Sequence, residues 1–479
     1  MPDSFYLTTT LPYVNASPHI GFALEIVAAD VIARAQRAAG KEVIFNTGTD
    51  EHGQKIFQQA AEAGQDPQAY TDEYAAKFAE LQKLLNLSYT HFIRTTNPDH
   101  KQAAQEFWRR CQNNGDIYKN TYRTLYCVGC ELEKQTSELE DGKCPLHPTK
   151  PLEEREEENY FFRFSRYQDA LLELYRSQPE FVKPSAKLKE ITAFVQGGLQ
   201  DFSISRLKEK MSWGVAVPGD DNHVMYVWFD ALINYISTLS WPQDQATFIK
   251  FWPGIQLAGK DNLRQQAAMW QAMLMSAQLP ASKQILINGF ISVEGQKMSK
   301  SLGNVIAPSE LVARYGQDAT RFLLMYLGPF GTDMDVSWSQ FDTLYTAHLA
   351  NGIGNVCSRV AKLCEKAEVQ HDQSVSPPAP IAQLRDTVFQ NYANFELKSA
   401  IDNITKIVTL IDESLSTIKP WTLSGEPQKE ALLNYLAQLH VLFQALAPIM
   451  PTTSKLLQSH FEEQPKISAL TPLFPRLKP

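Results

Sequence analysis

The chain has 479 residues, of which 44% are hydrophobic and 20% charged, so it holds enough apolar material for about three packed domains and is not a disordered chain. A mean hydropathy of −0.29, with no apolar run near the roughly 18 residues of a membrane span, excludes a membrane-spanning protein. The net charge of −8 argues against a protein that coats nucleic acid through bulk charge, and the first residues lack the basic and apolar regions of a signal peptide. We therefore expect a cytoplasmic protein with no membrane partner.

The first 116 residues alternate between strand and helix patterns. Residues 5–10 are a β-prone run, apolar residues recur at helical spacing over 20–31, and residues 42–46 start a second strand. A strand, a helix and a strand in this order form one βαβ unit of a parallel sheet, which binds ligands at the carboxyl ends of its strands. We predict that residues 1–116 form the first half of a Rossmann-like α/β catalytic domain.

Four metal-ligating residues cluster in the next segment with the spacing Cys127-x2-Cys130-x13-Cys144-x2-His147. Three thiolates and one imidazole in two turn-like pairs fit a closed, tetrahedral, structural zinc site. In a chain without secretory features this interpretation is favoured over disulfides, and four unconnected buried residues are the simpler alternative. We predict that residues 117–205 are an inserted domain that binds one structural Zn²⁺.

Apolar strand-like and helical segments resume after the insertion, and we assign residues 206–338 to the second half of the catalytic domain. The acidic run at residues 153–158, within the insertion, is most simply a solvated surface. After Trp338 the pattern becomes all-helical, with apolar stripes over residues 401–415 and 432–446. We predict an all-α bundle over residues 339–479.

Two polar segments about 280 residues apart indicate nucleotide chemistry. Residues 18–22 read Pro-His-Ile-Gly-Phe and fall where a strand turns into a helix, so backbone N–H groups and the positive helix end are available to an anion. Residues 295–304 hold two lysines and two serines between glycines, a composition that suits closure on a pyrophosphate. Taken alone, the first segment is more often a helix cap and the second a solvated turn.

Together, the two segments resemble the HIGH and KMSKS signatures of the class I aminoacyl-tRNA synthetases. Nearly the whole chain then resembles the methionyl-tRNA synthetase family, in its short form without a C-terminal dimerisation domain. The resemblance extends to the cysteine cluster and to residues 8–15, 46–53, 227–235, 259–261 and 355–359. It implies a monomer that ligates L-methionine to tRNA(Met) through methionyl-adenylate, with Mg²⁺ accompanying ATP.

The resemblance gives catalytic roles to His19, Lys297 and Lys300, of which His19 contacts an ATP phosphate and the lysines stabilise the departing pyrophosphate. By the same resemblance, the ATP-binding residues are His19, Gly21, Gly259, Asp261, Lys297, Ser299 and Lys300. One position departs from the family pattern. Phe22 stands where the second histidine of the signature is usual, so one phosphate or ribose contact is missing or replaced.

The resemblance also places the methionine pocket, in which Asp50 matches the ligand of the ammonium group and an apolar wall suits the thioether. The matching residues are Leu11, Tyr13, Asp50, Trp228, Ala231, Tyr235 and Gln266. Here too the chain departs from the family, since Gln265 and Gln266 stand where a phenylalanine and a histidine are usual. Gln266 still donates and accepts hydrogen bonds, so methionine remains the expected substrate.

In the helical bundle, Asn355, Arg359 and Trp421 match the residues with which the family reads the CAU anticodon. Asparagine and arginine are able to read splayed base edges, and tryptophan stacks on an unpaired base. Without the resemblance, the three residues are a helix face and a core tryptophan. The resemblance therefore adds tRNA(Met) as a partner.

Other interpretations compete with this one. A synthetase-like paralogue, with altered amino-acid specificity or with tRNA binding only, is favoured by the changes at Phe22, Gln265 and Gln266. The intact segment at residues 295–304, the lysine segment, argues against it, as does the presence of Asp50 and Trp228. The valine, isoleucine and leucine synthetases have a large editing insertion, for which about 90 residues with a zinc site leave no room. A cysteine-specific relative would place zinc in the amino-acid pocket, and an unrelated zinc module would leave both nucleotide segments without a role.

Overall fold

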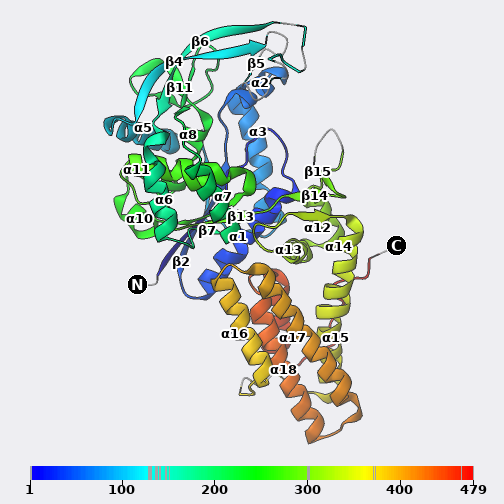
Figure 1. The fold of residues 1–479 in the computed structure, drawn as a ribbon. Helices are drawn as coiled ribbons and strands as arrows, with labels where there is room; N and C mark the ends of the chain where they lie inside the picture. Colours follow the sequence, from blue (N-terminus) through cyan, green and yellow to red (C-terminus); the bar gives the residue numbers. More distant parts are fainter. Residues whose placement is uncertain are drawn as a thin grey trace.

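The computed structural model describes residues 3–127, 132–134, 139, 142–145, 148–149, 151–298, 303–370, 372, 374–464 and 466–477. Figure 1 shows two parts: an α/β part around a parallel sheet and, below it, a bundle made by the C-terminal helices. In the described part of the chain, no helix combines the length and the apolarity that crossing a membrane requires.

Six parallel strands make the central sheet, in the order β3-β2-β1-β12-β13-β7. Their bounds are β1 (Ser4–Thr8), β2 (Glu42–Thr49), β3 (His91–Arg94), β7 (Val182–Lys183), β12 (Ile255–Gly259) and β13 (Gln284–Asn288). Consecutive residues of β1 and β12 are buried on both faces, as expected for a parallel sheet covered by helices on both sides. The predicted Rossmann-like parallel sheet is confirmed.

Helix α1 (Ile20–Ala38) follows β1 and is buried over most of its length. It begins after His19, whose imidazole accepts a hydrogen bond from the N–H of Gly21, and it ends before Gly40, which has a φ of 82°. The other helices of the α/β part are α2 (Gln54–Glu62), α3 (Pro67–Ala79), α4 (Leu81–Leu84), α5 (Pro98–Asn113), α6 (Gln168–Ser177), α7 (Ser185–Gln196), α8 (Val227–Ala231), α9 (Asn234–Ser237), α10 (Gln245–Phe251), α11 (Trp270–Ser276), α12 (Pro308–Tyr315) and α13 (Gln317–Tyr326), with the short turns η2 (Phe164–Tyr167), η3 (Lys260–Asn262) and η4 (Gln265–Met269).

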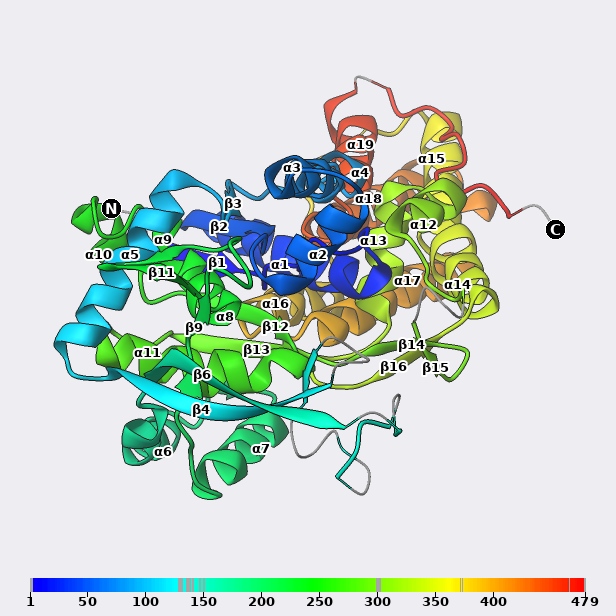
Figure 2. The same ribbon diagram turned by 90° about the horizontal axis from the view of Figure 1, so that it is seen from above.

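A four-stranded antiparallel sheet, in the order β5-β4-β6-β8, lies along the edge of the α/β part that is farthest from the bundle (Figure 1, Figure 2). Its bounds are β4 (Ile117–Cys127), β5 (Leu132–Lys134), β6 (Leu152–Phe162) and β8 (Phe202–Ser203). The two long strands pair from Ile117 opposite Phe162 to Cys127 opposite Leu152. Phe162 is buried and stacks on Tyr167 at 5.8 Å, which anchors this ribbon to the core.

Two three-stranded sheets complete the α/β part, in the orders β10-β11-β9 and β15-β14-β16. Their bounds are β9 (Ser205–Leu207), β10 (Ala216–Val217), β11 (Asp220–Met225), β14 (Ile291–Val293), β15 (Gln296–Lys297) and β16 (Met334–Val336). Strands β14 and β15 form a hairpin whose two turn residues, Glu294 and Gly295, both have positive φ, as a tight hairpin turn requires. The lysine segment therefore starts from a fixed hairpin.

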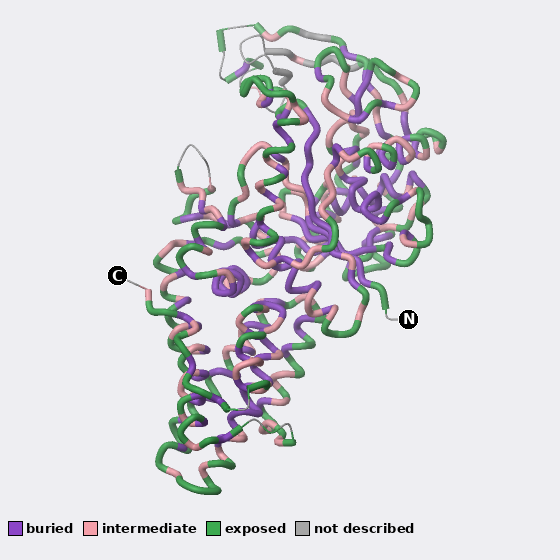
Figure 3. Tube along the Cα trace, turned by 180° about the vertical axis from the view of Figure 1, so that it is seen from behind, coloured by how far each residue is buried: buried purple, intermediate pink, exposed green. Residues whose placement is uncertain are grey.

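The C-terminal part is helical, as predicted, and contains α14 (Trp338–Leu344), η6 (Tyr345–Ile353), α15 (Gly354–Ala367), α16 (Ala379–Ala393), α17 (Leu397–Ile418), η7 (Pro420–Thr422), α18 (Glu426–Leu446), α19 (Pro451–Gln458) and η8 (Ser459–Glu463). The stripe predicted over residues 401–415 is the buried face of α17. Figure 3 shows this buried interior running between the helices of the bundle.

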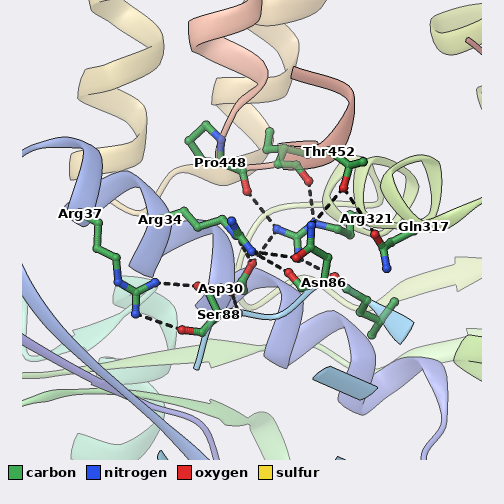
Figure 4. Close-up of polar contacts among 11 residues, drawn as sticks. Asp30, Arg34, Arg37, Asn86, Ser88, Gln317, Arg321, Pro448 and Thr452 are labelled. Atoms are coloured by element: carbon green, nitrogen blue, oxygen red, sulfur yellow. Dashed lines mark hydrogen bonds and ion pairs between the residues drawn. The ribbon is translucent and has the colours of Figure 1, made fainter. Parts of the chain in front are cut away.

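A buried ion pair in the α/β part lies at the boundary with the bundle, and its arginine forms hydrogen bonds with the bundle (Figure 4). Asp30 of α1 and Arg321 of α13 have fully buried side chains that lie 2.8 Å apart. The guanidinium of Arg321 also donates to the backbone oxygens of Leu85, Pro448 and Ile449 at 3.0, 3.0 and 2.7 Å. Each nitrogen of the guanidinium thus has a partner, which a buried charge requires.

Both carboxylate oxygens of Asp30 also have hydrogen-bond partners. One of its oxygens accepts hydrogen bonds from the backbone N–H and the hydroxyl of Ser88 at 2.5 and 2.6 Å, and the other accepts from Arg34 at 2.7 Å. Burial opposes ionisation, but Arg321 and Arg34 hold the pKa of Asp30 below its ordinary value. Both members of the ion pair are therefore charged, and its arginine forms the hydrogen bonds that link the two parts.

Replacing Arg321 with alanine is expected to destabilise the protein, because Asp30 and three backbone carbonyl groups would stay buried without their partner. Removing one member of a buried ion pair costs about 3–5 kcal/mol. Thermal unfolding followed by circular dichroism measures the effect as a lower Tm. The matched control is Arg176→Ala, which breaks an exposed pair with Glu173 and is expected to leave Tm nearly unchanged. Equal Tm values for the two variants would contradict the prediction.

Candidate active site

A cavity of about 770 Å³ opens at the carboxyl ends of β1, β2, β12 and β13, where parallel sheets bind their ligands. It brings together segments that are far apart in the sequence. Of the residues predicted at the ATP and methionine sites, those that line it are Leu11, Tyr13, His19, Gly21, Asp50, Trp228, Gly259, Asp261 and Lys297.

His19 and Gly21 form the turn that leads into α1. The N–H of Gly21 donates to Nδ1 of His19 at 3.0 Å, so Nε2 is the ring nitrogen that holds the proton and is able to donate to a phosphate oxygen. Burial lowers the pKa of His19 despite the charge of Asp261, so the ring is neutral near pH 7. A Cβ on residue 21 would lie 2.8 Å from Cε1 of His19, which explains the glycine.

The lysine segment reaches the same cavity through Lys297 and Met298. The ammonium of Lys297 is exposed and lies 5.8 Å from the centre of the Phe290 ring. The other two residues predicted in this segment, Ser299 and Lys300, lie outside the described residues. The structure therefore supports the meeting of the two nucleotide segments at one cavity.

Phe22 lines the cavity at the position where the family usually has a second histidine. Its ring packs edge-to-face against Phe78, with centroids 5.4 Å apart. The side chain extends the apolar packing of α1 toward α3 instead of offering a hydrogen bond. Asn15 and Ser17 line the same cavity and are the polar side chains nearest in sequence to this turn.

Asp50 follows β2 and is held in place by its two neighbours. The carboxylate of Glu51 accepts two hydrogen bonds from Arg94, at 2.6 and 2.9 Å, and His52 contacts a buried carboxylate of Asp230 at 2.6 Å. The other oxygen of Asp230 contacts His100 at 2.7 Å. These partners fix the backbone that follows Asp50, whose carboxyl group lines the cavity and has no side-chain partner among the described residues.

The surroundings of Asp50 oppose its ionisation. Burial, together with the charges of Asp230 and Glu51, raises the pKa of Asp50 well above its ordinary value. One of its oxygens has no hydrogen-bond partner among the described residues. By contrast, His52 and His100 hold the pKa of Asp230 at about 2 in spite of burial. Among the described residues, Asp50 therefore has no cationic partner, unlike Glu51 and Asp230.

A smaller cavity of about 70 Å³ adjoins the first one and shares Asp50 and Trp228 with it. Its lining includes further residues predicted for methionine, namely Ala231, Tyr235 and Gln266, together with Gln265. Tyr13 lines the large cavity but not this one. Asp50, the residue predicted to bind the ammonium group, therefore lies where the large cavity meets the smaller one.

Glu25 is a residue of the large cavity that sequence reasoning missed. Its carboxylate accepts hydrogen bonds from the backbone N–H and the hydroxyl of Thr10, both at 2.7 Å. Burial raises the pKa of Glu25 to about 7, against the opposing effect of Thr10. The signal that could have revealed Glu25 is an acidic residue within the apolar stripe of α1.

The predicted zinc ligands are only partly described. Cys127 ends β4 and Cys144 is buried, whereas Cys130 and His147 lie outside the described residues. Within the described part of the chain, no group of three or more possible metal ligands gathers. The zinc site therefore stays a prediction based on the donor set and its spacing.

Two of the three predicted anticodon residues are in contact. Arg359 on α15 has its guanidinium carbon 5.8 Å from the centre of the Trp421 ring, and the same guanidinium pairs with Asp412. Asn355 is exposed and lies one helical turn before Arg359, on the same face of α15. Trp421 is 48% exposed, which corrects its alternative interpretation as a core tryptophan.

Comparison with known proteins identifies the family. A family model described as "tRNA synthetases class I (M)" matches residues 5–146 and 128–361. The methionine–tRNA ligase of Thermosynechococcus vestitus is 42% identical over 95% of this chain and 90% of its own length. The chain belongs to the methionyl-tRNA synthetases. The family expected from the two nucleotide segments is thereby confirmed.

Two further methionyl-tRNA synthetases cover almost all of the chain. The chloroplastic/mitochondrial methionine–tRNA ligase of Arabidopsis thaliana is 42% identical over 95% of this chain and 77% of its own length. A solved structure of the Mycobacterium tuberculosis methionyl-tRNA synthetase in complex with methionyl-adenylate has a TM-score of 0.87 and 34% identity, and the match covers 96% of this chain and 94% of that one. The similarity therefore includes the cavity and the bundle together.

Glu25→Gln is expected to raise Tm relative to the unchanged protein, and increasingly so as pH rises. With a pKa of about 7, the folded Glu25 keeps a proton that the unfolded chain gives up near pH 4.5, so the fold loses stability between these pH values as pH increases. The full loss is about 3 kcal/mol. Tm measured from pH 5 to pH 8 tests this. The exposed control Glu173→Gln should show a difference that is independent of pH, and the same result for Glu25→Gln would refute the prediction.

Proposed function

We propose how the residues of this methionine–tRNA ligase divide its reaction, in which methionine and ATP give methionyl-adenylate and the tRNA then takes up the methionyl group. The observation on which the proposal rests is one cavity that joins the start of α1, the lysine segment and Asp50. Such a cavity holds a triphosphate and an amino acid side by side. The chemistry then needs positioning and charge neutralisation more than covalent catalysis.

At the nucleotide end, His19 donates from Nε2 to an ATP phosphate, and the backbone at the start of α1 faces the same anion. Gly21 and Gly259 leave room for the nucleotide next to the backbone, and Asp261 lines the same wall. Lys297 and Lys300, together with Ser299 of the same lysine segment, neutralise the pyrophosphate as it leaves the α-phosphorus. Mg²⁺ accompanies ATP and is bound mainly through the phosphates.

At the amino-acid end, the ammonium of methionine binds the unpaired oxygen of Asp50, and its positive charge favours the ionised carboxylate. Leu11, Tyr13 and Trp228 surround the backbone of the amino acid, and Trp228 is 41% exposed at the point that both cavities share. The thioether then lies in the smaller cavity against Ala231, Tyr235 and Gln266. Sulfur in contact with aromatic rings is favourable, which suits a methionine side chain.

The tRNA contacts two parts of the chain. We assign the catalytic domain to residues 1–116 and 206–338, the inserted domain to 117–205 and the anticodon-binding domain to 339–479. The support at the anticodon end is the contact between Arg359 and the exposed Trp421, which offers a stacking surface beside a hydrogen-bond donor. Asn355 extends the same helix face.

We assign one structural Zn²⁺ to Cys127, Cys130, Cys144 and His147. The donor set of three thiolates and one imidazole fills a tetrahedral site completely, so the metal would stabilise the inserted domain and take no part in the reaction. The burial of Cys144 and the position of Cys127 at the end of β4 support this assignment.

Two variants are expected to separate the two steps of the reaction. Lys300→Ala should slow methionine-dependent ATP–pyrophosphate exchange about a hundredfold with little change in KM for methionine, because its charge acts on the leaving pyrophosphate. Trp421→Ala should lower tRNA charging about tenfold relative to exchange, because it removes a stacking surface. Lys283→Ala and Ile418→Ala, both exposed, are the matched controls. Unchanged exchange in Lys300→Ala would remove the loop from the mechanism.

The zinc assignment predicts about one zinc per chain in the purified protein, measured by atomic emission spectrometry. Cys144→Ser is expected to lower the zinc content and the Tm together, because a structural site contributes to folding. The buried Cys357, which lies in the bundle, gives the control variant Cys357→Ser, which should keep its zinc. An active protein without metal would rule the site out.

A further inference from the structure

Three buried oxygen atoms without a hydrogen-bond partner belong to residues of the smaller cavity. They are Oδ1 of Asp50, Oε1 of Gln265 and Oε1 of Gln266, each unpaired among the described residues. All three are acceptors, and no unpaired buried donor belongs to the described residues of this cavity. Because a buried acceptor without a partner is destabilising, this arrangement is suited to a ligand that brings donors.

The backbone of this segment explains why both glutamines line the cavity. They begin η4, a π-helical turn that continues into α11, and wide turns of this kind are frequent at functional sites. The carboxamide of Gln271 donates to the backbone oxygen of Gln266 at 2.8 Å and to the hydroxyl of Ser282 at 3.1 Å. The turn is therefore fixed to the protein interior.

The side chain of Gln266 has a defined orientation. It is 3% exposed, and its amide nitrogen donates to the hydroxyl of Tyr235 at 2.6 Å. Tyr235 is itself held in place, since its backbone oxygen accepts a hydrogen bond from Tyr6 at 2.8 Å. The bond to Tyr235 fixes the plane of the amide, and the carbonyl oxygen of Gln266 has no partner among the described residues.

The three acceptors face two different parts of an amino acid. Asp50 also lines the large cavity and is assigned to the ammonium group, whereas Gln265 and Gln266 line the smaller cavity alone. Methionine brings no donor to that end, because its thioether has no hydrogen on sulfur. Bound methionine therefore leaves the two glutamine oxygens unpaired.

We propose that Gln265 and Gln266 form an acceptor site at the side-chain end of the methionine pocket, through which the enzyme also activates linear amino acids of methionine's length that end in a hydroxyl group. The bond changes are those of the methionine reaction. A carboxylate oxygen of the amino acid bonds to the α-phosphorus of ATP and pyrophosphate leaves, while the side-chain hydroxyl stays intact and donates to a glutamine oxygen. This proposal rests on the assignment of the smaller cavity to the amino-acid side chain.

The test compares side chains of equal length in ATP–pyrophosphate exchange. Norleucine ends in a methyl group, 5-hydroxynorvaline ends in a hydroxyl group, and O-methylhomoserine has an ether oxygen that only accepts. An apolar pocket rejects an added hydroxyl by about a hundredfold. We expect the unchanged enzyme to use 5-hydroxynorvaline with a kcat/KM within about tenfold of that for norleucine, since an acceptor offsets this loss.

Gln266→Leu and Gln265→Leu keep the approximate side-chain length and remove the amide. We expect Gln266→Leu to lower the ratio of kcat/KM for 5-hydroxynorvaline over norleucine by about tenfold, and Gln265→Leu to lower it by a smaller factor. A variant with a distorted pocket lowers both values and leaves their ratio unchanged, so the ratio isolates the hydrogen bond. The methionine rate of the unchanged enzyme is measured alongside.

Each outcome decides one point. A ratio that neither substitution changes would overturn the acceptor site while the methionine rate upholds the proposed function. A loss confined to O-methylhomoserine would show that the amide donates, which also overturns it. No exchange with methionine in the unchanged enzyme would instead remove the proposed function on which this inference rests.

Discussion

The ion pair between Asp30 and Arg321 is the constraint on which the position of the active site depends. Helix α1 reaches the cavity at His19 and Gly21, and about 16 Å farther along the same helix Asp30 is bound to α13. Arg321 in turn holds the backbone between α18 and α19. Because α1 is a continuous buried helix, the turn at His19 and the C-terminal bundle are positioned by one rigid element.

At the amino-acid end of the cavity, the carboxylates of Glu51 and Asp230 have side-chain partners, whereas Asp50 has none among the described residues. Glu51 is neutralised by Arg94, and Asp230 lies between two histidines, so both carboxylates are structural. Their negative charges nevertheless act on Asp50, which has no cationic partner among the described residues. Glu51, in the segment that follows β2, and Asp230 of α8 thus hold the structure around Asp50, whereas Asp50 itself lines the cavity.

Much of this architecture follows from local sequence pattern. The parallel sheet and the buried face of α17 could be predicted, because periodicity and turn residues act over short distances. The meeting of the two nucleotide segments could be expected only from the resemblance to the class I synthetases. Glu25 and the contacts of Asp230 could not, because their meaning depends on Thr10, His52 and His100, which approach only in the folded chain.

The acidic run at residues 153–158 shows the same limit from the opposite side. Its charges indicate a solvated surface, and Glu153, Glu156 and Glu158 are indeed exposed, but the run also forms part of β6 and is paired along its length with β4. Glu157 in this strand is buried and lies 3.3 Å from Lys210.

The raised pKa values of Glu25 and Asp50 have a consequence for binding, since both residues line the large cavity. Because its surroundings oppose the ionisation of Asp50, the apparent affinity for an amino acid reflects the cost of ionising this carboxyl group as well as the attraction between opposite charges.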